Sequence, residues 1–224
     1  MLVKDWNNNL QELRSIILKP DMIAESKKLC LELHQMVHLS EVSDSKYKTF
    51  EDELWEGLDE QTMRLATNKK GRTIVYGIWH STRIEDITMN LLVCGHKQVF
   101  ESGNWHPLIQ SPIRHTGNSL STEGIAGFSQ VVNIEELKKY RISVGQKTRE
   151  IIKSLEQGNF NQKVIKDNLG RILSEGAVDN VASANWLIDF WGNKNIAGII
   201  LMPALRHNLV HINESLEAKG RRKN

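Results

Sequence analysis

The sequence predicts an all-α fold, and three observations carry that prediction. Apolar residues recur at helical spacing along most of the 224-residue chain, no alternating strand pattern persists, and two segments begin at residues that commonly cap helices. A composition of 40% hydrophobic and 25% charged residues is that of an ordinary globular protein. We therefore expect residues 1–224 to form a single domain, an all-helical bundle with additional short helices.

The first half of the chain contains the clearest helical patterns. One apolar stripe follows Pro20 and comprises Met22, Ser26, Leu29, Leu33, Met36 and Val37. Thr49 is placed to cap a shorter helix that carries Asp52 in its first turn. A long helix should then run from about Arg72 to about Glu101, before a Ser-Gly-Asn sequence breaks it.

The second half begins with a stretch of little periodicity. Residues 102–132 are rich in Gly, Ser, Asn, Pro and His, so we expect a long irregular loop that is functional or mobile. Asn133 should cap a long helix that reaches about Leu155, and short helices are expected at 161–174 and 179–191. The last helix contains Pro203, which either begins it or kinks it.

Charge and cysteine content exclude several classes of protein. A net charge of +2 gives no basic stripe for nucleic acid, and the basic ending at 221–223 is typical of a solvated terminus. The longest apolar run, Ile196–Leu205, is too short to cross a bilayer. Cys30 and Cys94 lie in helical, largely apolar patterns and are expected to be free thiols. These features indicate a soluble cytoplasmic protein that binds neither membrane nor nucleic acid.

Two histidines four residues apart, His207 and His211, are the most informative feature of the chain. An apolar stripe at helical spacing predicts that their segment is a helix, and it consists of Leu205, Leu209, Ile212 and Leu216. Both imidazoles then lie on one helix face and can bind one transition-metal ion. This face, which also carries Glu214, is nearly opposite the apolar stripe. The histidines are therefore either in solvent or on the second buried face of a helix that is covered on both sides.

A metal site needs a third ligand, and His80 is the best candidate. It shares a helix face with Ile84, Ile87, Leu91 and Cys94, which places its imidazole on the inward face of a long helix. The alternative is a core histidine that is satisfied by a hydrogen bond. The neighbouring charged residues, Arg83, Glu85 and Asp86, are expected on a solvated face.

The remaining candidates have plain structural alternatives. Glu214 either accepts a hydrogen bond from a ligand ring or is an exposed carboxylate. His34 and His38, also four residues apart, are either rival ligands or substrate contacts, or a partly exposed polar flank. Trp105 and His106 are candidates to line a cleft.

Several familiar catalytic motifs are missing from the sequence. The histidine pair lacks the glutamate of zincins, and no histidine has Glu three residues before it, as in ferritin-like di-metal bundles. The sequence contains no phosphate-binding glycine loop and no GxSxG elbow. No catalytic residue can therefore be named from motifs.

Two segments together resemble the DinB/YfiT-like superfamily. They are Trp79-His80-Ser81-Thr82-Arg83-Ile84-Glu85-Asp86 and Met202-Pro203-Ala204-Leu205-Arg206-His207-Asn208-Leu209-Val210-His211. The resemblance covers roughly residues 20–216 and implies a four-helix bundle in which His80, His207 and His211 bind a divalent metal. It also implies a homodimer, since family members are often dimers.

The resemblance further implies a class of chemistry. Characterised relatives are metal-dependent transferases that use low-molecular-weight thiols such as bacillithiol or mycothiol, and a mycothiol-dependent isomerase. Three imidazoles suit zinc, nickel, iron or copper, and the ion would act as a Lewis acid and stabilise a thiolate. This chain is longer than the common members, near residues 50–66 and 161–191, and these segments could cover the metal or remove a thiol-binding surface.

The leading hypothesis is a DinB-like protein with a three-histidine site that acts on a small-molecule substrate, as a thiol-dependent transferase or a related hydrolase or isomerase. The alternative is a non-catalytic helical bundle, a binding or stress-response protein with no retained metal chemistry. Six tryptophans, including Trp186 and Trp191, fit such an interface, although core packing explains them equally well.

Overall fold

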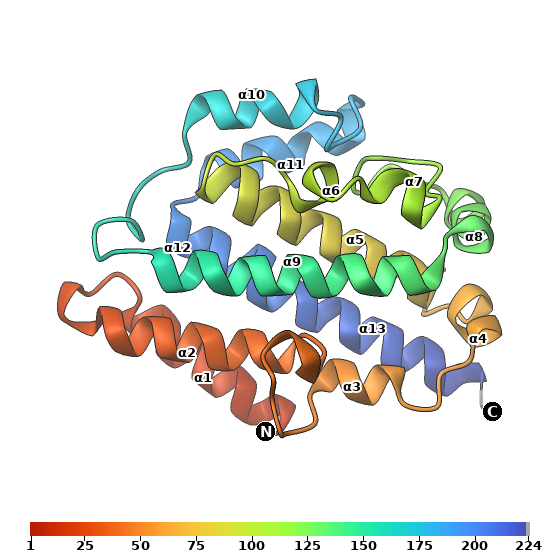
Figure 1. Ribbon diagram of the computed structural model, residues 1–224, viewed down its shortest axis with the longest axis horizontal. Helices are drawn as coiled ribbons and strands as arrows, with labels where there is room; N and C mark the ends of the chain where they lie inside the picture. Colours follow the sequence, from red (N-terminus) through yellow and green to blue (C-terminus); the bar gives the residue numbers. More distant parts are fainter. Residues whose placement is uncertain (223–224) are drawn as a thin grey trace.

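The computed structural model describes residues 1–222, and over this range the protein is built from helices (Figure 1). The described residues form no strand, only isolated bridges between Thr67 and Thr73 and between Lys163 and Asn195. The predicted all-α class is therefore confirmed. No described helix has both the length and the apolar character that a membrane span requires.

The helices differ widely in length. In the first half they are α1 (Val3–Ile16), η1 (Pro20–Met22), α2 (Ile23–Met36), η2 (Ser40–Val42), α3 (Phe50–Trp55), α4 (Glu60–Leu65), α5 (Ile74–Asp86) and the π-helix η3 (Ile87–Val93). The second half contains α6 (Val99–Ser102), α7 (Trp105–Ile109), α8 (Thr122–Val131), α9 (Ile134–Ser154), α10 (Lys166–Ser174), α11 (Ala182–Gly192), α12 (Ile196–Ile199), the π-helix η4 (Ile200–Arg206) and α13 (His207–Arg222).

Helix α5 is the centre of the molecule, and every one of its 13 residues is buried. It packs against α9 and α13, while α2 packs against α9 and η4. Figure 1 shows α1 and α2 on one side of this group and α10 and α11 on the other. Because α5 has neighbours on all sides, its polar residues are enclosed together with its apolar ones.

The two helix starts predicted from capping residues are confirmed. The Thr49 hydroxyl accepts a hydrogen bond from the Asp52 backbone N–H at 3.1 Å, and the Asp52 carboxylate accepts one from the Thr49 N–H at 2.9 Å. The Asn133 side chain accepts from the Glu136 N–H at 3.2 Å and begins α9. Each cap satisfies backbone donors that have no partner inside the helix.

Two predicted boundaries are wrong. The helix expected to reach Glu101 ends as η3 at Val93, because Gly95 takes a left-handed conformation with φ of 68°. The stretch expected to be irregular, 102–132, contains α7 and α8. Ser121 caps α8 by accepting from the Gly124 N–H at 3.1 Å, a start that the glycines of this segment obscure.

Pro203 does not begin the last helix, so the first of the two alternatives expected for it is wrong. It lies inside η4, within a helical run that continues from α12 through α13. Proline has no N–H to donate and its ring crowds the preceding turn, and a π-helical turn accommodates this defect. The widened turn ends immediately before His207.

Buried apolar side chains form two clusters. Ile74 and Trp79 of α5 belong to one cluster, and Ile84 and Ile87 belong to the other. The same helices also bury many polar side chains, which include His34, His38, Glu51, His80, Arg83, Glu85, Arg141, Asn208 and His211.

Both cysteines are free thiols, as predicted. Burial raises the pKa of the Cys30 thiol to about 12, and it also raises the pKa of Cys94. Thiolate is the nucleophilic form of cysteine, so these shifts argue against a catalytic role for either residue.

Candidate metal centre

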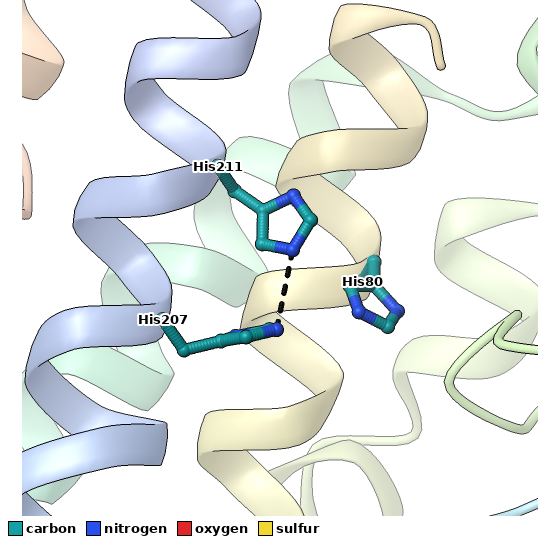
Figure 2. A group of neighbouring side chains, drawn as sticks. All are labelled: His80, His207 and His211. Atoms are coloured by element: carbon teal, nitrogen blue, oxygen red, sulfur yellow. Dashed lines mark hydrogen bonds between the residues drawn. The ribbon is translucent and has the colours of Figure 1, made fainter. Parts of the chain in front are cut away.

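The three histidines singled out from the sequence meet in one place. His80 comes from α5, and His207 and His211 come from successive turns of α13 (Figure 2). The ring centroid of His80 lies 5.1 Å from that of His207 and 4.8 Å from that of His211, and the centroids of His207 and His211 are 4.5 Å apart. One ring nitrogen of each residue lies within 4.8 Å of the others, so the three side chains could share one ion.

Hydrogen-bond partners indicate which nitrogens carry protons. His80 Nδ1 lies 2.9 Å from the Thr116 carbonyl oxygen, which can only accept, so we assign the proton to Nδ1. His211 Nδ1 lies 3.3 Å from the Glu214 carboxylate, an ionic contact that does not have hydrogen-bond geometry, and this anion also favours a proton on Nδ1. In both residues Nε2 is then the unprotonated nitrogen, which is the form that binds a metal.

The Nε2 atoms of His207 and His211 face each other at 3.2 Å (Figure 2). Two ligand nitrogens that are bound at about 2.1 Å to one ion are separated by a similar distance. His207 Nδ1 is buried and has no hydrogen-bond partner among the described residues. The spacing of this pair is therefore compatible with a shared ion, and in this structure a hydrogen bond joins the two Nε2 atoms.

Burial keeps all three imidazoles neutral. It lowers the pKa of His80 to about 3, with the neighbouring His211 adding to the effect. It also lowers the pKa of His211, and lowers that of His207 well below its ordinary value. A neutral imidazole binds a metal without first losing a proton, so these shifts favour ligation.

Glu214 holds the outer side of His211. Its side chain is only 14% exposed, and it accepts hydrogen bonds from Lys70 Nζ at 2.7 Å and from Arg72 Nη1 at 3.2 Å. Burial alone would raise its pKa, but the contacts with His211 and Lys70 outweigh burial and lower the pKa well below the ordinary value. Glu214 is thus an anionic partner of a ligand candidate and not an exposed carboxylate.

Helix α13 is covered on both faces. Leu209 and Ile212 on one side are buried in the core, and His211 on the other side is buried as well. The helical pattern left the histidines either in solvent or on a second buried face of the helix, and in the structure they lie on a second buried face.

A cavity of about 370 Å³ opens onto the three rings. Its lining is formed by Lys70, Arg72, His80, Ile84, Asn118, Trp186, Leu187, Phe190, Trp191, Met202, Pro203, His207, Val210, His211 and Glu214. Helix α11 forms one wall, with Trp191 in the core and Trp186 52% exposed. Trp105 and His106, the expected cleft residues, are not part of this lining.

A second cluster joins His34 of α2, His38 and Glu85 of α5. The imidazoles stack with centroids 4.1 Å apart, and their Nε2 atoms lie 2.9 Å and 3.0 Å from the two oxygens of the Glu85 carboxylate. Asn208 donates a third hydrogen bond to Glu85 at 2.7 Å. The expected polar flank is therefore wrong, because all three ionisable side chains are fully buried.

This second cluster also has three potential ligands within reach of one another, but it fits a metal less well. Each Nε2 donates its proton to Glu85, so neither lone pair there is free. Metal binding through Nε2 would break both hydrogen bonds to Glu85 and move both protons to Nδ1 atoms. The hydrogen bonds already satisfy the carboxylate, and they hold its pKa well below the ordinary value against the effect of burial.

The charged residues beside His80 are buried, contrary to the expected solvated face. Arg83 donates to the Tyr140 hydroxyl at 3.0 Å, and this hydroxyl donates to Asp86 at 2.6 Å. Arg141 of α9 contacts Glu51 and also Asn208. Tyr140, Arg141 and Asn208 were not singled out from the sequence, because each acts through partners that are distant along the chain.

Comparisons with protein-family models and with curated protein sequences gave no match.

Proposed function

We propose that this chain is a DinB-like metalloprotein that holds one divalent metal ion on His80, His207 and His211 and acts on a small molecule. The observation that carries the proposal is the convergence of three neutral imidazoles, from two helices, at the wall of a cavity. Three protein ligands beside an open space are typical of catalytic metal sites, whereas structural sites are usually closed by four ligands.

The donor set fits such an ion. Nitrogen ligands suit zinc, nickel, iron or copper, and they do not select one of them. The contacts of His80 with Thr116 and of His211 with Glu214 are the outer contacts that metal-binding histidines commonly make. The resemblance of the two histidine segments to the DinB/YfiT-like superfamily supports the same three ligands.

The proposed reaction is a metal-dependent transfer with a low-molecular-weight thiol, or a related hydrolysis or isomerisation. A bound divalent ion would supply a Lewis acid that lowers the pKa of a thiol or water. The chain itself contributes orientation, since Glu214 holds the His211 ring and Thr116 holds the His80 ring. The apolar wall of α11 would limit the access of water to the site.

The wider parts of the proposal rest on the family resemblance. Helices α2, α5, α9 and the α12–α13 run would form the four-helix bundle of DinB type, and the protein would work as a homodimer in the cytoplasm. The segment 161–191 includes most of α11, and in this proposal it would cover the metal site through the Trp186 wall of the cavity.

Elemental analysis of protein purified without a histidine tag tests the metal site. We expect about one divalent ion per chain, lost in a His207→Ala/His211→Ala double variant and retained in the control His96→Ala, whose side chain is exposed. Metal-loaded protein is then assayed for consumption of a free thiol with an electrophile. An absence of metal from the wild type, under conditions that load other histidine sites, contradicts the proposal and favours a non-catalytic bundle.

A further inference from the structure

We propose that the cavity beside the three histidines binds a small organic anion with an apolar ring or branched chain, the acidic group at Arg72 and the apolar group against Trp186. This inference rests on the proposed function, because it names the class of substrate for the same site. It is carried by the uneven distribution of charge and apolar surface along the cavity, which the family resemblance does not imply.

The order of residues along the last helix separates the two ends of the cavity. Met202 and Pro203 line it before the histidines, and Glu214 lines it after them. Pro203 and Glu214 are eleven residues apart, which corresponds to about 16 Å along a helix. A ligand lying along this helix therefore meets the imidazoles between its two ends.

The end near Glu214 carries a net positive charge. Lys70 and Arg72 contribute two positive charges and Glu214 one negative charge, which leaves +1 while the three imidazoles are neutral. Among the described residues, the Arg72 side chain makes its hydrogen bond to Glu214 through Nη1. The rest of its planar fork remains for a carboxylate or a similar anion, which arginine binds through paired hydrogen bonds.

The wall of the cavity that α11 forms is apolar and aromatic. Trp186 and Phe190 of α11 pack edge to face with centroids 6.1 Å apart, and Met202 and Pro203 lie on the facing helix. Trp186 is 52% exposed although the chain buries Trp6, Trp79 and Trp191 completely or nearly so. An aromatic ring left at the wall of a cavity is a typical contact for the apolar part of a ligand.

A further cation beside Phe190 does not add charge to the cavity lining. Lys194 Nζ lies 4.4 Å from the centroid of the Phe190 ring, a cation–π contact. Lys194 is not among the residues that line the cavity. The cavity volume of about 370 Å³ is at the lower end of the range for small-molecule sites, so the ligand is small.

Isothermal titration of the metal-loaded, full-length protein with three matched probes tests the proposal. The probes are 4-phenylbutyrate, which has both groups, 4-phenylbutanol, which lacks the charge, and butyrate, which lacks the ring. We expect 4-phenylbutyrate to bind at least tenfold more tightly than either of the others. Equal affinities for all three, or no binding of 4-phenylbutyrate, overturn the proposal.

Two variants test where the carboxylate and the phenyl ring of 4-phenylbutyrate bind. Arg72→Gln should weaken 4-phenylbutyrate about tenfold and leave 4-phenylbutanol unchanged, while Trp186→Ala should weaken both phenyl probes and leave butyrate unchanged. Lys69→Gln is the matched control, because Lys69 is exposed, pairs with Glu217 and lies outside the cavity lining. If Arg72→Gln leaves 4-phenylbutyrate unaffected, the acid binds elsewhere and the proposal is wrong.

Metal content measured on the same samples separates this inference from the proposed function. Protein that contains the metal and fails to discriminate the probes contradicts the inference alone. Protein that contains no metal contradicts the proposed function, and the same titrations then decide the inference for the metal-free cavity.

Discussion

Among single side chains, His38 shows most clearly how burial changes a pKa. Its imidazole has no exposed surface, and burial lowers its pKa to about 4, although the Glu85 carboxylate opposes the shift. In the unfolded chain the same ring titrates near 6.5. Between pH 4 and pH 6.5 the unfolded state therefore binds a proton on this ring that the folded state does not bind. The stability from this group is complete above pH 6.5 and is lost as the pH falls toward 4.

We expect the unfolding free energy of the metal-free protein to fall steeply from pH 6.5 to pH 4.5. His38→Gln keeps a donor for Glu85 and removes the titrating ring, so it should reduce the slope by about 1.4 kcal/mol per pH unit. Chemical denaturation at several pH values measures this, with the exposed His96→Gln as control. A slope that is identical in wild type and His38→Gln would show that His38 does not stay neutral in the folded protein.

Among the helices, α9 shows how closely the elements approach the buried histidines. A Cβ atom at Gly145 would lie 2.8 Å from His38 Nδ1 and 2.9 Å from Val42 Cγ1. Real side chains do not tolerate such separations, so a glycine is needed where α9 passes the second cluster. Gly127 on α8 is the opposite case, since an added Cβ there meets nothing within 4 Å.

The same substitution should therefore have opposite effects at these two positions. Gly145→Ala is expected to lower the unfolding free energy by about 1–3 kcal/mol, because overpacking outweighs the better helix propensity of alanine. Gly127→Ala should raise it by up to about 1 kcal/mol. Urea denaturation of both variants checks this pair, and equal effects would contradict the packing described around His38.

The helices themselves were predictable where one face is apolar and the start is capped. Thr49 and Asn133 begin helices as expected, and the stripe that contains Leu209 identified the helix of His207 and His211. The surroundings of α5 were harder to predict, because periodicity cannot show that a helix is enclosed on every side. Its charged residues were consequently assigned to solvent, when distant partners on α2, α9 and α13 in fact bury them.

The candidate site was predictable in its members but not in its surroundings. Spacing on two helices was enough to select His80, His207 and His211, which the structure brings together. His38 lies beyond the end of α2, so helical spacing could not place it beside Glu85. The cavity wall at Trp186 depends on how α11 packs on the bundle, which no local pattern reveals.

For the molecule as a whole, the candidate metal centre links metal binding to stability. An ion on His80, His207 and His211 would join α5 to α13 in the folded state only, and so would stabilise it by mass action. At a free metal concentration of 100 times Kd this amounts to about 2.7 kcal/mol, or a rise of about 5–10 °C in Tm for a chain of this size.

Thermal unfolding with and without zinc or nickel measures that rise. The His207→Ala/His211→Ala variant should show no metal-dependent shift, and a His34→Gln/His38→Gln variant should show the full shift from a lower starting Tm. A shift that disappears only in the second variant would place the ion at the Glu85 cluster.

X-ray absorption spectroscopy of the metal-loaded protein, purified without a histidine tag, tests the three-histidine site most directly. We predict a first coordination shell with three imidazole nitrogens at about 2.0–2.2 Å, reduced to two in His80→Ala. A shell of two imidazoles and a carboxylate that persists in the His207→Ala/His211→Ala variant would contradict the proposed metal centre.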